Sequence, residues 1–293
     1  MRPQTLVLLL AGALLAGCAQ HVNAPAERTP LPETRFRVEQ GVVFREGADG
    51  AQPLHADLYT PITLGPYPTV LAVPGGDWEG GHPKDMRFLA EYLAQRGLAV
   101  MAIQHRGAGD GIGLSEQLQD LHAALRWIRS NASAHRLDTE RLAVLGFESG
   151  GHLGAMLGLA QSARRPLPDL PRDASLPPVR AVVAGGAALN LLPAGDRPEV
   201  RRLLPDTSEK TLRKASPVFV AHAEAPPFFF FHGDRDGRWP IAGAEAMLAE
   251  LDQFGVRAEL YRMKGRGHTT TYLTVSSALA AAAEFLWREL ERY

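Results

Sequence analysis

The chain has 293 residues, a formal net charge of −1 at pH 7 and 45% hydrophobic residues. This length is enough for one large domain, and the nearly balanced charge, without a basic run, argues against a nucleic-acid partner. A single cysteine excludes a disulfide framework and a cysteine metal site. No pattern in the sequence points to a metal or to any other cofactor.

The N-terminal residues have the pattern of a secretory signal. Arg2 supplies a positive charge, and the apolar run at 6–15 is too short for an ordinary transmembrane helix. The run ends in Leu15-Ala16-Gly17-Cys18, which resembles a bacterial lipobox. This resemblance implies cleavage after residues 1–17 and a lipid on the Cys18 thiol. An ordinary signal peptide with an incidental cysteine is the alternative.

The predicted lipid anchor also predicts a location. No aspartate follows Cys18, because the next residue is Ala19, and by family resemblance this favours the periplasmic face of the outer membrane. We therefore expect a bacterial cell-envelope protein that contacts the membrane through Cys18. Residues 18–35 comprise this cysteine and a segment rich in Ala and Pro, which we interpret as a tether.

Residues 36–293 alternate strand-like and helix-like stretches. An antiparallel hairpin opens the domain, and strands are expected at 38–44, 54–59, 69–73, 98–103, 142–146, 179–184, 227–231 and 256–263. Helices are expected at 86–96, 114–130, 153–159, 241–254 and 272–290. This order predicts an α/β fold, with a mostly parallel sheet covered by helices on both faces. Ligands of such sheets bind at the carboxyl ends of the strands.

The stretch Gly146-Phe147-Glu148-Ser149-Gly150 joins a predicted strand to a predicted buried helix. Strand, glycine-rich turn and helix is the layout of a nucleophile elbow, G-x-S-x-G, where the glycines permit a tight turn. Gly146 and Gly150 match the two glycines, so the nucleophile position falls on Glu148. Taking Ser149 as the nucleophile would put Phe147 where the first glycine must fit, and this register is disfavoured.

Three further stretches follow predicted strands and bear on the same chemistry. Val73-Pro74-Gly75-Gly76-Asp77-Trp78 is glycine-rich and can direct backbone N–H groups at a developing oxyanion. The stretch 231–236 ends in the carboxylate of Asp236, and 264–268 ends in the imidazole of His268. Nucleophile, acid and histidine follow one another in the chain order of α/β-hydrolases.

From about Tyr67 onward the chain resembles the esterase/lipase branch of the α/β-hydrolase superfamily, near its hormone-sensitive-lipase-like and bacterial feruloyl-esterase-like groups. This resemblance implies an α/β-hydrolase fold with small cap or loop insertions, and an ester-like small molecule as ligand or substrate. It also implies that Asp236 is the triad acid and His268 the triad base. Alone, either residue has a structural explanation, as a helix cap or as a solvated loop residue.

The resemblance further implies an oxyanion hole formed by the backbone N–H groups of Gly76, Asp77 and Ser149. The chain departs from the family at two positions. Pro74 replaces a histidine of the family, a change that the backbone donors downstream can survive. Glu148 replaces the serine nucleophile, so ordinary serine-esterase activity is expected to be absent or weak.

Two interpretations of Glu148 remain open. In the first, the carboxylate is stabilised at a helix N-terminus, pairs with protonated His268 and Asp236, and extends toward the position of a substrate carbonyl. The protein is then a pseudoenzyme that binds a ligand or acts as a scaffold in the envelope. In the second, Glu148 is itself a covalent nucleophile, as the aspartate is in related hydrolases with a Gly-x-Asp-x-Gly elbow, and His268 activates water. The protein is then an atypical hydrolase.

Overall fold

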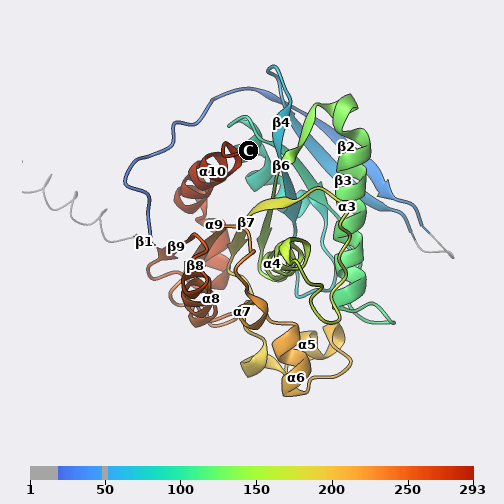
Figure 1. Ribbon diagram of the computed structural model, residues 1–293, viewed down its shortest axis with the longest axis vertical. Helices are drawn as coiled ribbons and strands as arrows, with labels where there is room; N and C mark the ends of the chain where they lie inside the picture. Colours follow the sequence, from blue (N-terminus) through green and yellow to red (C-terminus); the bar gives the residue numbers. More distant parts are fainter. Residues whose placement is uncertain (1–18, 48–51) are drawn as a thin grey trace, which may run out of the picture.

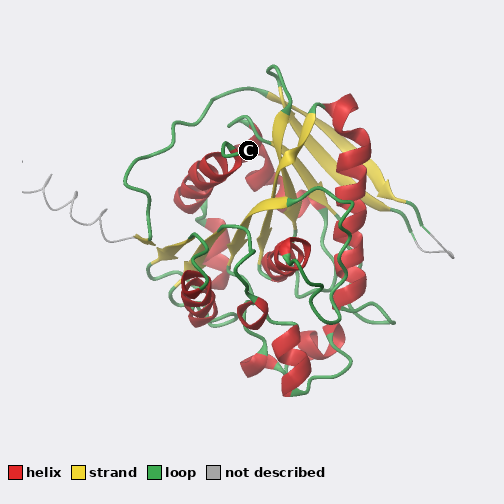
Figure 2. Ribbon diagram, in the orientation of Figure 1, coloured by secondary structure: helices red, strands yellow, loops and turns green. Residues whose placement is uncertain are grey.

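The computed structural model of the chain describes residues 19–47 and 52–293 (Figure 1). The predicted signal peptide, residues 1–17, and Cys18 lie outside the described residues. Helices cover both faces of one nine-stranded sheet, whose strand order is β1-β9-β8-β7-β6-β4-β5-β3-β2 (Figure 2). Strands β4 to β9 run parallel, whereas β1, β2 and β3 are antiparallel to their neighbours. This arrangement is the α/β fold that the sequence predicts.

The elements have the following bounds. The strands are β1 Ala19–Val22, β2 Phe36–Arg45, β3 Leu54–Pro61, β4 Tyr67–Val73, β5 Ala99–Ile103, β6 Leu137–Phe147, β7 Val179–Gly185, β8 Phe228–Gly233 and β9 Ala258–Met263. The helices are η1 Pro83–Met86, α2 Arg87–Ala94, α3 Leu114–His135, α4 Ser149–Ser162, η2 Leu192–Ala194, α5 Pro198–Leu203, α6 Glu209–Lys214, α7 Pro217–Val220, α8 Ala242–Gln253, α9 His268–Leu273 and α10 Ser276–Leu290. No helix in the described ranges is long and apolar enough to cross a membrane.

The predicted strands and helices are present, with two differences. The closing helix predicted at 272–290 is two helices, α9 and α10, and α9 begins at His268. The predicted tether is not free of regular structure, because its first residues form β1 along the edge of β9, with Ala19 opposite Met263. Asn23 then donates a side-chain hydrogen bond of 3.0 Å to the Ala258 carbonyl. The pairing satisfies backbone groups that β9 would otherwise expose.

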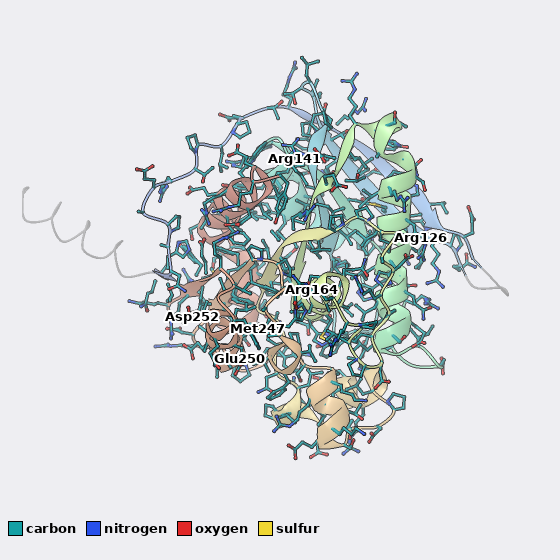
Figure 3. All side chains as sticks on the ribbon, in the orientation of Figure 1. Arg126, Arg141, Arg164, Met247, Glu250 and Asp252 are labelled. Carbon is teal, nitrogen blue, oxygen red and sulfur yellow. The ribbon has the colours of Figure 1, made fainter. Side chains whose placement is uncertain are left out.

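The phenylalanines of β8 show how the sheet is held between two layers. Phe228 and Phe230 belong to the core on the side of α3, α4 and α8, whereas Phe229 and Phe231 belong to the core on the side of α2 and α10. All four rings are fully buried. Figure 3 shows side chains filling the space between the layers, among them Met247 of α8, which is also fully buried. The alternation is that of a central strand covered on both faces.

The turn between β6 and α4 is as tight as the predicted elbow requires. Glu148 at its tip has φ 55° and ψ −120°, a backbone conformation that non-glycine residues rarely adopt. A Cβ atom on Gly146 would lie 2.2 Å from the Gly150 carbonyl oxygen, and one on Gly150 would lie 2.2 Å from the Val73 carbonyl oxygen. Both glycines are therefore required by close backbone approach.

We predict that Gly146→Ala destabilises the fold, because backbone atoms on both sides of the turn must move to admit the new methyl group. The expected loss in the free energy of unfolding is on the order of 3 kcal/mol, at the upper end of the usual overpacking range. Urea denaturation measures it. Gly243→Ala is the matched control, since its Cβ would make only ordinary contacts of 3.7 Å or more inside α8. Equal stability of the two variants would contradict the prediction.

Candidate active site

The carboxylate of Glu148 lies in the predicted oxyanion hole. Its Oε2 accepts hydrogen bonds from the backbone N–H groups of Gly76 at 2.8 Å and Asp77 at 2.9 Å. Its Oε1 accepts a third bond, of 3.0 Å, from the indole Nε1 of Trp239. The residue is only 4% exposed. The elbow side chain thus occupies the place that the hole of an esterase keeps for a substrate oxygen.

These donors keep the buried carboxylate charged. Burial raises the pKa of Glu148, but hydrogen bonds from the backbone N–H groups of Gly76, Ser149 and Asp77 outweigh it and lower the pKa to about 2. Three amide donors on one carboxylate commonly have this effect. Glu148 also stands at the N-terminus of α4, where the helix dipole favours an anion. The residue is therefore an anion at any pH near neutrality.

The loop after β4 owes its shape to left-handed backbone and a buried tryptophan. Gly76, Asp77 and Trp78 have φ values of 131°, 55° and 58°, which turn the Gly76 and Asp77 N–H groups toward Glu148. Trp78 is fully buried, and its Nε1 donates to His152 Nδ1 at 3.1 Å. The other ring nitrogen of His152 donates to the Ala215 carbonyl at 2.8 Å. Burial lowers the pKa of His152 to about 4, which keeps the imidazole neutral as this pair of bonds requires.

Asp236 and His268 meet at the carboxyl ends of β8 and β9. His268 Nδ1 lies 2.7 Å from Asp236 Oδ2. Asp236 Oδ1 accepts the backbone N–H groups of Arg238 at 2.8 Å and Trp239 at 2.9 Å. Burial raises the pKa of Asp236, but bonds from His232, His268 and the Trp239 N–H outweigh it and hold that pKa well below its usual range. The pair has the geometry of the acid and histidine of a hydrolase triad.

The predicted ion cluster of Glu148 with His268 and Asp236 is wrong. Within residues 19–47 and 52–293, His268 forms an ion pair with Asp236 and none with Glu148. The reason is that amide and indole N–H groups already satisfy both oxygens of Glu148. The Asp236–His268 pair is therefore separate from the elbow carboxylate.

Ser149 lies behind the turn. Its side chain is fully buried, and Oγ has no hydrogen-bond partner in the described structure. Only its backbone N–H acts on Glu148, where it lowers the pKa of the carboxyl. This arrangement favours the register that puts Glu148 at the tip of the turn.

Two residues of the site escaped the sequence analysis. Trp239 supplies the indole donor to Glu148 and stacks edge-to-face on Trp78, with ring centroids 5.6 Å apart. Arg238 forms an ion pair with Asp77, with Nε 3.0 Å from Oδ1. This pair connects the loop after β8, called here the acid loop, to the loop after β4, called here the oxyanion loop. The sequence offers one sign of their role: Arg238 and Trp239 lie two and three residues after the predicted triad acid, Asp236.

A pocket of about 620 Å³ opens over these groups. Its lining comprises Gly75, Gly76, Asp77, Asp85, Met86, Phe147, Glu148, Arg238, His268, Thr269 and Tyr272. This volume suits a small organic molecule. The described ranges contain no group of three or more His, Cys, Asp or Glu side chains arranged to hold a metal ion. A ligand in the pocket would meet the imidazole of His268, an apolar wall, and the carboxylate of Glu148.

The depressed pKa of Glu148 predicts an acid-sensitive contribution to stability. The folded-state pKa, about 2, lies below the ordinary value of 4.5, so the stabilisation is complete above pH 4.5 and is lost as the pH falls toward 2. Between pH 7 and pH 3 the wild type should lose about 2 kcal/mol through this residue. Urea unfolding of Glu148→Gln should lack that part of the loss. Glu33→Gln, at an exposed position, is the control and should follow the wild type, and a Glu148→Gln profile that also did so would refute the assignment.

Comparison with known proteins shows a family match and a similarity to proteins named as esterases. The family model described as BD-FAE matches residues 56–251. A probable isoprenylcysteine alpha-carbonyl methylesterase of Oryza sativa subsp. japonica is 28% identical over 247 residues, covering 79% of this chain and 58% of that protein. Esterase LipC of Mycobacterium tuberculosis is 28% identical over 250 residues, covering 78% and 60%. The chain thus spans somewhat more than half the length of these relatives.

Solved structures share the fold. A truncated carbohydrate esterase from gut microbiota superposes with a TM-score of 0.75 at 22% identity, over 90% of this chain and 100% of that one. A thermophilic esterase of the Planctomycetes species Thermogutta terrifontis gives 0.70 at 24% identity, over 87% and 92%. These likenesses show the α/β-hydrolase fold, and the family match over residues 56–251 shows that the chain belongs to the BD-FAE family.

Proposed function

We propose that this chain is a bacterial envelope protein that binds an ester-like small molecule and has lost serine-esterase turnover. The observation that carries the proposal is the position of Glu148 Oε2, 2.8 and 2.9 Å from the two N–H groups that an esterase uses to stabilise its oxyanion. Acyl transfer needs those donors free when negative charge develops on the substrate. Here a resident anion holds them, so a substrate carbonyl cannot enter the hole.

The elbow also lacks an effective nucleophile. A serine would be activated by proton transfer to histidine, but Ser149 Oγ is buried and has no hydrogen-bond partner among the described residues. The Glu148 carboxylate has a pKa of about 2, and its lone pairs are engaged by N–H donors, so its electrons are poorly available for attack. Binding without turnover is the function that this geometry supports best.

The ligand class follows from the pocket and the family. The similar proteins are named as a probable methylesterase, an esterase and a carbohydrate esterase. The pocket has an aromatic and apolar wall from Phe147, Met86 and Tyr272 beside the polar groups. We therefore assign an ester-bearing or ester-like small molecule as the ligand. Its polar end would meet His268 and Arg238 at the rim.

Glu148→Ser is expected to create esterase activity. The substitution frees the Gly76 and Asp77 donors and supplies a hydroxyl to the pocket that His268, already paired with Asp236, also lines. Positioning of reacting groups lowers a barrier by several kcal/mol. Hydrolysis of p-nitrophenyl acetate should rise above that of the wild type by on the order of 10²-fold, the scale of one positioned general base.

Two variants control this experiment. Glu148→Ala opens the hole without adding a nucleophile, and Glu148→Ser with His268→Ala removes the base. Both should stay at the level of the wild type. An active wild type, or an inert Glu148→Ser variant that folds normally, would count against the proposal that Glu148 alone blocks an otherwise complete site.

Covalent catalysis by Glu148 is the second candidate, and the retained Asp236–His268 pair favours it. His268 is held through Nδ1, and no described residue bonds its Nε2, which is the arrangement needed to activate water against an ester intermediate. The step would form a bond from a Glu148 oxygen to an electrophilic carbon while an alkoxide or halide leaves, and water would then cleave the new ester.

In that case His268→Ala should accumulate an adduct on the Glu148 peptide after incubation with epoxides or haloalkanes, because the intermediate forms but is not hydrolysed. Mass spectrometry of the digested protein detects it. Glu148→Gln with His268→Ala should give no adduct. A wild type inert to all these compounds, with no adduct in His268→Ala, leaves the binding function as the conclusion.

We also propose that Cys18 carries a lipid and anchors the protein in the bacterial envelope, at the periplasmic face of the outer membrane. The support is the lipobox-like motif Leu15-Ala16-Gly17-Cys18. Cys18→Ser should abolish incorporation of labelled fatty acid, because the acceptor thiol is gone, and should leave the precursor unprocessed or release the protein. Labelling followed by gel fluorography measures this. Equal label in wild type and variant would show that Cys18 is not the acceptor.

A further inference from the structure

We propose that the face formed by the loops at 234–236 and 264–267 lies against an anionic lipid bilayer, so that the ligand pocket opens beside the membrane surface. This inference rests on the proposed membrane attachment through Cys18. To the proposed anchor it adds the orientation of the domain relative to the membrane. It also identifies the bilayer as the source of the ligand. The occupant of the face is therefore a layer of acidic phospholipid headgroups.

The first argument is where the N-terminal residues leave the domain. Strand β1 is antiparallel to β9, and Ala19 is opposite Met263, the last residue of β9. Residues before Ala19 therefore join the domain at the carboxyl edge of the parallel strands, the edge that also carries Glu148 and His268. Cys18 directly precedes Ala19 in the sequence, so the proposed lipid would be attached one residue before β1 enters this edge.

The second argument is charge. The two loops are joined by backbone bonds, from the Arg235 N–H to the Arg266 carbonyl at 2.9 Å and from the Asp234 N–H to the Met263 carbonyl at 3.2 Å. They carry Arg235, Lys264 and Arg266, and none of these cations has an ion pair within the described part of the chain. The neighbouring carboxylate of Asp234 accepts the Gly265 N–H at 2.6 Å. Unpaired Lys and Arg side chains near a membrane surface are attracted to its acidic lipids.

Cations elsewhere on the described domain are of both kinds: Arg165, Arg172 and Lys210, for example, are also without an ion pair, whereas others near the site and near β1 are paired. Arg202 of α5 pairs with Glu79, and Lys214 of α6 pairs with Asp169. Arg262 of β9 pairs with Glu245, and Arg288 of α10 pairs with Glu259. The cations at 235, 264 and 266 thus stand where the chain would meet the membrane and are left without protein partners.

The third argument is the apolar rim of the pocket. Helix α9 begins directly after the loop at 264–267, and its residues His268, Thr269 and Tyr272 line the pocket. Its last residue, Leu273, is 73% exposed. A leucine beside a cationic loop can enter the headgroup boundary, as the apolar residues of interfacial helices do. A pocket wall seated at that boundary would receive an amphiphilic ester directly from the lipid layer.

The test uses single-cysteine labelling of the full chain, purified from bacterial membranes in detergent and reconstituted into vesicles of phosphatidylethanolamine and phosphatidylglycerol. Leu273→Cys and Leu64→Cys each carry an environment-sensitive fluorophore, and nitroxide-bearing lipids quench it. Leu64 is the matched position, 93% exposed and in the loop before β4, at the opposite end of the parallel strands. Strong quenching at 273 with little at 64 is expected.

Charge reversal supplies the second arm. Arg235→Glu, Lys264→Glu and Arg266→Glu together should reduce quenching at 273 to the level found at 64. Arg165→Glu, Arg172→Glu and Lys210→Glu are exposed cations elsewhere and form the control, which should behave as the wild type. Unchanged urea unfolding of both triple variants excludes loss of the fold. Vesicles of phosphatidylcholine alone should lower the quenching at 273.

The outcomes separate this inference from the rest. If the protein floats with the vesicles but the two labels are quenched alike, or if the triple variant keeps the wild-type pattern, the orientation is refuted and the lipid anchor stands. If the full chain does not float with vesicles, the membrane attachment and the orientation both fail. Neither result bears on the role of Glu148 in the pocket.

Discussion

One buried carboxylate connects the parts of this site. Glu148 extends from the turn between β6 and α4, and it receives N–H groups from the loop after β4 and an indole N–H from the loop after β8. The segments that follow β4, β6 and β8 are distant in sequence, and they are joined through the two carboxylate oxygens of Glu148. A buried carboxylate without hydrogen-bond donors would destabilise the fold. The turn can therefore carry Glu148 only because both loops supply N–H donors to it.

The same network extends outward to the histidine. Trp239, which donates to Glu148, also donates its backbone N–H to Asp236, and Asp236 in turn holds His268. Arg238, between them in sequence, is paired with Asp77 of the oxyanion loop. The acid loop therefore supports both the carboxylate in the hole and the imidazole at the pocket. Because the supports are shared, the contacts that hold Glu148 in the hole also keep Asp236 and His268 in place.

The fold and the positions of the main site residues could be read from local pattern. Apolar runs of strand length and the glycines of the elbow define the parallel sheet and put Glu148, Asp236 and His268 at one edge. The direction of the Glu148 side chain could not be read, and His268 and Asp236 were predicted as its partners. The choice depends on how many N–H groups converge on the hole, and Trp239 contributes through a contact 91 residues away in sequence. Strand β1 was missed for a similar reason, since its partner β9 lies at the other end of the chain.

The run of phenylalanines in β8 has a consequence for the chain before it is folded. Phe228 to Phe231 are covered on one face through residues that include Phe285 of α10, and along one edge by β9. Both of these elements come later in the chain, so one face and one edge of this strand remain uncovered until the last elements have been synthesised. Four adjacent aromatic residues without a charge or proline among them form the kind of segment that associates with copies of itself. The folding of this protein thus depends on keeping that segment apart from other chains until its C-terminal helix is available.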